Sequence, residues 1–181
     1  EILLIKQFNN DDSFKNTNIT INQEIHGKIF YLEGLVDLNK IGEVIIKKFE
    51  LNEDLYLFPS VVEVKTIDEC INKLIQGNAI VFDYKNNKIA SVELRQLYLR
   101  SINEPDNEKL IKGPREGLIE NIIVNVSLIR NKVKRKDFKI EYSNIKSDGE
   151  QRIGIIYLND VVDKKALRIL KKRLEKINKI K

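Results

Sequence analysis

The chain has 181 residues, of which 42% are hydrophobic and 33% are charged. This balance is enough to bury a core, so it excludes global disorder, and the length allows one large domain or two small ones. The net charge of +5 is too modest to indicate a nucleic-acid-binding protein by itself. A single cysteine excludes an internal disulfide framework, and no apolar run approaches the roughly 20 residues that cross a bilayer.

The N-terminal part of the chain alternates between helix and hairpin patterns. Residues 1–8 predict a short helix or another element packed on the body of the domain. Apolar and polar residues then alternate over 14–21 and 25–32, which predicts an antiparallel hairpin. Asp37 is a good N-cap for a helix over 37–49, whose apolar positions follow helical spacing.

A second group of elements follows after an irregular segment. Thr66 is a helix cap, Gly77 is the preferred residue just beyond a helix end, and Asn86-Asn87 is a turn signal between two apolar runs. The predicted elements are a strand over 61–64, a helix over 67–75, and hairpin strands over 79–83 and 88–92.

Residues 100–130 begin as a charged connector and become the most regular helix pattern in the chain. Gly113 and Pro114 interrupt the connector, and Pro114 suits the first turn of a helix. Glu116 and Glu120 place negative charge near the positive end of the helix dipole. The helix is predicted from apolar residues at helical spacing, which are Leu118, Ile119, Ile122, Ile123, Val126 and Ile129.

The C-terminal part repeats the hairpin and helix patterns. Residues 138–145 and 152–158 predict a third hairpin around Asp148-Gly149, and Asp163 begins a final helix. Since successive hairpins favour antiparallel pairing, we predict an α/β fold of the α+β type. It has two small subdomains, each a mixed or largely antiparallel sheet with packed helices. The predicted subdomains are residues 1–104 and 105–181, with the connector opening the second.

The residue types that most often carry catalysis are better explained by structure here. His26 is the only histidine and Cys70 the only cysteine, so neither has an obvious partner for a metal site or an activated thiolate. The sequence also has no glycine-rich phosphate-binding loop. We therefore predict no catalytic residue, no metal site and no cofactor.

The connector also favours a structural role. Gly113 and Gly117 precede a helix, but Pro114 removes one N–H donor and Glu116 adds negative charge, which disfavours anion binding. The acidic residues of this region alternate with basic ones. These acids are Glu104, Glu108, Glu116 and Glu120, and the bases are Arg100, Lys109, Lys112 and Arg115. This mixture favours an ion-pair network across a subdomain or subunit junction over paired catalytic carboxylates.

The connector and its helix carry a composite motif. It reads Arg100-x-Ile102-x-Glu104-Pro105-x-x-Glu108, Gly113-Pro114-Arg115-Glu116-Gly117-x-x-Glu120 and Asn125-x-x-Leu128-Ile129-Arg130. Two further segments accompany it, Tyr31-Leu32-Glu33-Gly34-Leu35-Val36-Asp37 and Arg173-Leu174-x-x-Ile177. Together they resemble the signature of the A subunit of bacterial spore germinant receptors, the GerA family. Leu118 and Lys112 depart mildly, because phenylalanine and arginine are commoner there in the family.

The resemblance implies the soluble N-terminal domain of a receptor A subunit, on the cytoplasmic (spore core) side of the inner spore membrane. Its implied partners are a permease-like B subunit and a lipoprotein C subunit, and it allows self-association. Membrane segments absent from this chain would tether it. The implied role is non-enzymatic: receptor assembly and signal transmission during nutrient-triggered germination, with nutrient recognition mainly on the B subunit.

On this interpretation the connector is a stiff hinge between the subdomains. The predicted interaction and hinge residues are Arg100, Glu104, Pro105, Glu108, Gly113, Pro114, Arg115, Glu116, Gly117 and Glu120. Two alternatives remain. One is a small-ligand module that binds a nutrient or ion between the subdomains. The other is a basic nucleic-acid-binding protein, which the dispersed charge disfavours, so we predict no nucleic-acid partner.

Basic residues gather over 132–136 and 164–181. A solvated face is the default interpretation, because Glu175 and an apolar stripe are interleaved with the bases of the second segment. If these bases have a partner, the membrane tether implied by the resemblance favours anionic lipid over nucleic acid.

Overall fold

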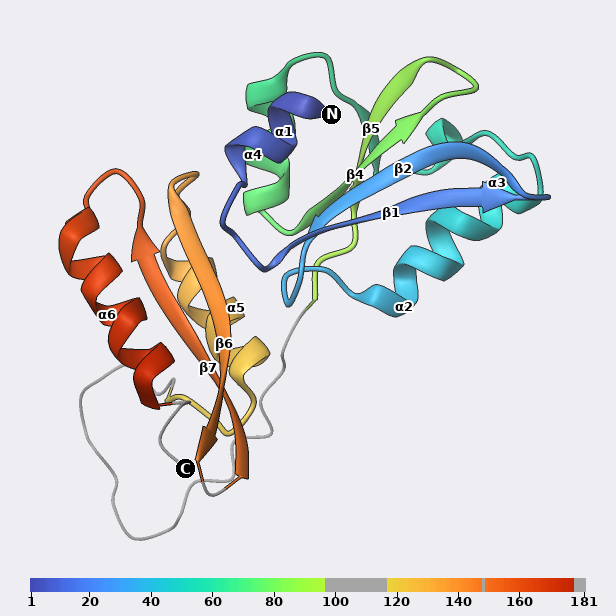
Figure 1. Cartoon of the computed structure of the whole chain (residues 1–181). Helices are drawn as coiled ribbons and strands as arrows, with labels where there is room; N and C mark the ends of the chain where they lie inside the picture. The colour runs from blue at the N-terminus through green and yellow to red at the C-terminus, as the bar shows by residue number, and fades with distance from the viewer. Residues whose placement is uncertain (97–116, 148, 178–181) are drawn as a thin grey trace, which may run out of the picture.

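The computed structural model describes residues 1–96, 117–147 and 149–177 (Figure 1). In these ranges the chain forms two antiparallel sheets, one of five strands and one of two, with helices packed on them. The larger sheet has the strand order β1-β2-β4-β5-β3. Its strands are β1 (Phe14–Ile21), β2 (Glu24–Leu32), β3 (Val61–Glu63), β4 (Asn78–Asp83) and β5 (Lys88–Glu93).

Helical segments cover both faces of the larger sheet (Figure 1). One face carries α1 (Ile2–Gln7) and α4 (Ile67–Ile75); the other carries α2 (Leu38–Lys40), η1 (Ile41–Ile46), α3 (Lys47–Glu50) and the short turn η2 (Leu55–Leu57). Successive residues of a strand point to opposite faces. Ile80 of β4 therefore packs with α1 and α4, while its neighbour Val81 packs with Ile45 of η1. Burial on both faces explains why β4 is apolar along most of its length.

Local capping signals set the helix positions in this part of the chain. The Thr66 side chain accepts from the Glu69 N–H, and the Glu69 carboxylate accepts from the Thr66 N–H, which completes a capping box for α4. Asp37 accepts from the Asn39 N–H at 3.1 Å and begins the second helical run. That run is helical as predicted, but η1 within it is a π-helical segment, which the regular spacing of its apolar residues does not indicate.

The smaller sheet is covered by one helix on each face. Its elements are α5 (Ile122–Lys132), β6 (Phe138–Ser147), β7 (Gly149–Leu158) and α6 (Lys164–Ile177). Val126 of α5 packs with Phe138 and Ile140 on one face. Lys171 of α6 pairs with Glu141, whose side chain points away from that of Ile140. The two helices therefore enclose the hairpin between them.

Helix α5 begins later than its sequence predicts. Its N-cap is Asn121, whose side chain accepts from the N–H groups of Ile123 and Val124 at 2.9 and 3.3 Å. The Asn125 side chain also binds the backbone N–H and carbonyl of Ile119 at 2.8 and 2.6 Å. These contacts hold the preceding segment outside the helix. The predicted apolar stripe therefore loses its first two members, Leu118 and Ile119, which are exposed.

The predicted fold class is confirmed, since both sheets are antiparallel and carry packed helices. All three predicted hairpins, the short N-terminal helix and the final helix are also present. The boundary between residues 104 and 105 lies outside the described ranges, so the division into two subdomains stays a proposal. Among the described helices, none has the length and apolar character needed to cross a membrane.

Candidate functional site

Most of the predicted hinge residues lie outside the described part of the chain. These are Arg100, Glu104, Pro105, Glu108, Gly113, Pro114, Arg115 and Glu116. Gly117 and Glu120 are described, and both lie exposed in the irregular segment before α5. Among the described residues, no heavy atom lies within 4 Å of the position that a Cβ atom at Gly117 would occupy. The ion-pair network of the connector stays a prediction.

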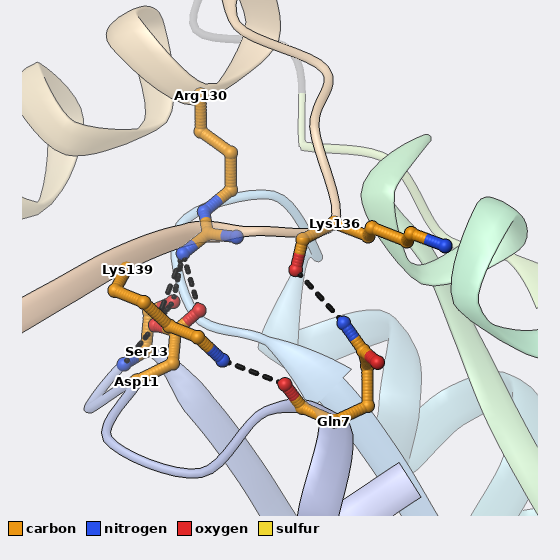
Figure 2. Close-up of polar contacts among 6 residues, drawn as sticks. All are labelled: Gln7, Asp11, Ser13, Arg130, Lys136 and Lys139. Atoms are coloured by element: carbon orange, nitrogen blue, oxygen red, sulfur yellow. Dashed lines mark hydrogen bonds and ion pairs between the residues drawn. The ribbon is translucent and has the colours of Figure 1, made fainter. Parts of the chain in front are cut away.

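A buried arginine joins α5 to the N-terminal segment of the chain (Figure 2). Arg130 Nη2 donates to Asp11 Oδ1 and Oδ2 at 3.0 and 2.7 Å and to Ser13 Oγ at 2.9 Å. Ser13 Oγ in turn donates to Asp11 Oδ1 at 2.8 Å. The side chains of Arg130 and Asp11 are 1% and 0% exposed. An ion pair between distant parts of the chain is thus removed from water.

The surroundings of Arg130 are only partly polar. Its guanidinium carbon lies 4.4 Å from the centre of the Phe138 ring, a cation–π contact. Among the described residues, its Nε and Nη1 atoms have no hydrogen-bond partner, and neither does Oε2 of Glu33. Buried polar groups are nearly always satisfied in folded proteins. Within the described part of the chain, Arg130 therefore combines a fixed ion pair with two N–H groups that have no acceptor.

The segment around Gly34 packs directly on α5. Gly34 has a φ of +83°, and a Cβ atom there would lie 3.1 Å from Ile123 Cγ2 and 3.2 Å from Ser127 Cβ. The positive φ favours glycine, and the neighbouring atoms of α5 leave little room for a Cβ atom. The chain that follows β5 also contacts this segment, because the Gln96 N–H donates to the Leu35 carbonyl at 2.8 Å. Two segments of the composite motif thus meet in space.

We call Asp11, Ser13, Gly34, Ser127 and Arg130 the Arg130 junction. Further contacts extend it along β6. The Asp12 N–H donates to the Ile140 carbonyl at 2.8 Å, and the Tyr142 N–H donates to Asp12 Oδ2 at 2.6 Å. Lys139 Nζ donates to the Gln7 carbonyl at 2.6 Å, and Gln7 Nε2 donates to the Lys136 carbonyl at 3.2 Å (Figure 2). The N-terminal segment therefore lies against both α5 and the smaller sheet.

A cleft of about 500 Å³ opens next to these contacts, between α1 and α4 on one side and the ends of the β6–β7 hairpin on the other. Its apolar lining comes from Leu3, Ile67 and Ile71. Its charged lining is three lysines and three aspartates, namely Lys6, Lys136, Lys139, Asp68, Asp137 and Asp160. The cleft thus offers both signs of charge over a partly apolar floor.

The pKa values of two groups in the cleft are both lowered, which disfavours the charged form of Lys139 and favours the charged form of Asp137. Burial lowers the pKa of Lys139, and the nearby carboxylates of Asp11 and Asp137 only partly offset it. Hydrogen bonds from Arg135, at 2.8 Å from Nε and 2.9 Å from Nη2, hold the pKa of the Asp137 carboxyl below its usual range. Asp137 is therefore stabilised as an anion. The Lys139 side chain is desolvated, and its hydrogen bond to the Gln7 carbonyl fixes its position.

The two residues with the greatest catalytic potential lie away from the junction. Cys70 is buried in the apolar cluster under α4, and burial raises the pKa of its thiol, which makes the thiolate harder to form. His26 is half-buried on β2. Within the described ranges, no group of three or more histidine, cysteine or acidic residues is placed to hold a metal ion.

Sequence reasoning missed most of the junction. Arg130 was in the composite motif but was not among the predicted site residues, and Asp11, Ser13 and Lys139 were not singled out. One signal was available: an arginine three positions after the small Ser127 and four after Val126 falls on the apolar face of a helix. Its partner is 119 positions away, and no local pattern specifies a pair at that separation.

The architecture has a counterpart among solved structures. The crystal structure of the N-terminal domain of the A subunit of the Bacillus megaterium spore germinant receptor GerK3 matches with a TM-score of 0.69 and 17% sequence identity. The match covers 96% of this chain and 68% of that chain. The protein therefore has the α/β fold of a germinant-receptor A-subunit N-terminal domain.

Sequence comparison gives the family itself. The model of the family described as Bacillus/Clostridium GerA spore germination protein matches residues 3–180. The chain belongs to this family. Spore germination protein KA of Bacillus subtilis (strain 168) is 28% identical over 167 residues, which is 85% of this chain and 31% of that protein. Spore germination protein A1 of the same organism is 25% identical over 185 residues, 97% of this chain and 38% of that protein. The chain thus spans about a third of these curated relatives.

Proposed function

We propose that this chain is the N-terminal domain of the A subunit of a spore germinant receptor and acts in nutrient-triggered germination. Family membership over residues 3–180 and the fold match over 96% of the chain support this role. The domain would lie on the cytoplasmic side of the inner spore membrane and work with a permease-like B subunit and a lipoprotein C subunit. Its contribution is receptor assembly and signal transmission.

The observation that carries a transmission role is the buried ion pair of the Arg130 junction. Asp11 precedes the larger sheet, and Arg130 is on the helix that covers the smaller one. Displacing one sheet relative to the other would expose or break this pair, which costs several kcal/mol. The arrangement with the ion pair intact and the arrangement with it broken would therefore be two discrete states, as a switch requires. We propose the connector from Glu104 to Gly117 as the hinge of this motion.

The test uses Asp11→Asn in the whole receptor, because this change keeps the side-chain shape and removes the charge. We expect spores with the variant to respond poorly to nutrients at normal receptor levels. The exposed lysine change Lys40→Gln is the matched control and should leave germination unchanged. Normal germination of Asp11→Asn spores, despite reduced stability of the isolated domain, would reduce the junction to a folding element and reject the transmission role.

The connector is tested separately through Arg115. Surface ion pairs contribute only about 0–1 kcal/mol to stability. Arg115→Ala should therefore leave the melting temperature of the isolated domain unchanged, and in the receptor it should impair germination by weakening a subdomain or subunit contact. If Arg115→Ala spores germinate like the parent strain, the connector motif is a folding signature only.

A second candidate function is small-ligand binding, and the cleft of about 500 Å³ favours it. Pockets that hold small molecules have a similar volume and combine apolar walls with a few polar groups. The lysines and aspartates that line the cleft suit a zwitterion such as an amino acid, which carries both a carboxylate and an ammonium group. Ligand-observed NMR against amino acids, sugars and nucleosides decides the matter. Saturable binding that Asp68→Asn abolishes would favour this function, whereas no binding supports recognition on another subunit.

A further inference from the structure

Helix α6 holds the whole excess of positive charge in this protein. It has seven lysine and arginine residues and one glutamate. The remaining chain has 25 of the 32 basic residues and 26 of the 27 acidic residues, so its net charge is close to zero. The basic character of the protein is therefore a property of one helix and not of its surface in general.

Two of the seven cations are occupied by neighbouring elements. Lys171 pairs with Glu141 of β6. Lys164 Nζ donates to the backbone and side-chain oxygens of Asn159 at 2.9 and 2.6 Å. These contacts, together with half-buried Leu167 and Leu174, fix which side of α6 faces the sheet.

The other five cations lie together on the opposite side. They are Lys165, Arg168, Lys172, Arg173 and Lys176, and all are exposed. At 3.6 residues per turn they occupy a sector of about 140° around the helix axis. Among the described residues, none of these five side chains has an ion pair, hydrogen bond or ring contact; the backbone N–H of Lys165 donates to Asp163 Oδ1 at 2.7 Å. We call these five residues and Ile169 the basic face.

Apolar side chains within and beside the basic face distinguish it from an ordinary solvated surface. Ile169 lies inside the sector and is 49% exposed. Leu170 and Ile177, at the edge of the side that faces the sheet, are 44% and 40% exposed. A strongly amphipathic helix that combines lysine and arginine with exposed apolar groups is the pattern of helices that lie in a membrane interface.

We propose that the basic face of α6 binds the surface of a membrane that contains anionic phospholipid. The five cations of the basic face would contact headgroup phosphates, and Ile169 would enter the boundary between headgroups and acyl chains. Membrane binding by this face is independent of whether the chain acts in a receptor. Nucleic acid is the less suitable partner, because α6 carries no aromatic side chain that could stack on bases.

The experiment is vesicle co-sedimentation of the whole 181-residue chain. Vesicles of phosphatidylcholine with phosphatidylglycerol should bind the chain, and vesicles of phosphatidylcholine alone should bind it at least about tenfold more weakly. Binding should fall steeply when salt is raised, because exposed charges are screened. Equal binding to both vesicle types would overturn the proposal.

Two triple variants with the same change in net charge provide the decisive comparison. The first variant, Lys165→Gln/Lys172→Gln/Lys176→Gln, removes three of the five cations of the basic face. It should weaken binding to the anionic vesicles about tenfold or more. Lys40→Gln/Lys47→Gln/Lys65→Gln removes three exposed lysines elsewhere and should bind like the parent chain. Equal losses in both variants would show a general charge effect and reject the basic face as the site.

Two further measurements complete the test. Ile169→Ser leaves the charge unchanged and should also weaken vesicle binding, which tests insertion of the apolar side chain. Duplex DNA at physiological salt should bind more weakly than the anionic vesicles. Tighter binding to DNA would assign the basic face to nucleic acid and overturn the lipid proposal. Circular dichroism of each variant confirms that α6 remains folded.

Discussion

Arg130 gives the clearest expectation at the scale of single residues. Arg130→Met should lower the free energy of unfolding by about 3–5 kcal/mol, because it leaves the buried carboxylate of Asp11 without its cation. Urea denaturation of the isolated chain measures this. Arg168→Met is the control, since Arg168 is exposed and surface changes usually stay within about 0.5 kcal/mol. Equal effects of the two changes would mean that the Arg130 side chain is not buried in solution.

Asp137 gives an expectation for pH. Its pKa is depressed below 3.8 by Arg135. An acid whose pKa is lower in the folded than in the unfolded state stabilises the fold. This contribution is fully present at pH values above the unfolded-state pKa, and it is lost as the pH falls through the lower folded-state pKa. An NMR titration should therefore give the Asp137 carboxyl a pKa below 3.8. The change Arg135→Gln should raise this pKa. A titration midpoint at or above 3.8 in the parent chain would contradict the bidentate contact.

At the scale of elements, the approach of the Gly34 segment to α5 depends on one glycine. Gly34→Ala should destabilise the fold by about 1–2 kcal/mol from the left-handed backbone angle alone, and the contacts with Ile123 and Ser127 add to this cost. Gly42→Ala is the matched control, because a Cβ atom there meets nothing within 4 Å. It should leave the stability unchanged or raise it by up to about 1 kcal/mol. Thermal melting of both variants measures the difference.

The elements that the sequence predicts well are those with local causes. The capping box of Thr66 and Glu69 and the alternation along β1 and β2 involve residues a few positions apart, so the pattern contains the interaction. The predicted start of α5 was wrong, because the Asn125 side chain binds the backbone N–H and carbonyl of Ile119. An asparagine in mid-helix gives no sign that its amide holds the preceding backbone outside the helix.

The candidate site was harder to predict than the fold for the same physical reason. The Arg130 junction joins residues from three segments that are adjacent only after both sheets have formed. Gly34 and Arg130 were visible as motif members, yet nothing local indicates that Gly34 packs on α5. Asp11 and Ser13 lie in a polar break that looks like an ordinary loop.

At the scale of the whole molecule, the described apolar clusters belong to separate sheets: one lies on each face of the larger sheet, and a third lies between α5 and the smaller sheet. The buried ion pair is a main link between them. Replacing both partners, in Asp11→Asn/Arg130→Met, removes the link without leaving a buried charge. Differential scanning calorimetry should then resolve two unfolding transitions where the parent chain shows one. A single transition in both proteins would argue against two subdomains.

The separation of 119 positions between Asp11 and Arg130 also has a consequence for synthesis. A ribosome that adds about 5–20 residues per second releases the carboxylate roughly 6–24 seconds before the guanidinium. Without its cation the Asp11 carboxylate is too costly to bury, so the N-terminal loop should remain hydrated while the strands of the larger sheet emerge and pair. The loop around Asp11 would thus stay open until α5 emerges and supplies the Arg130 guanidinium.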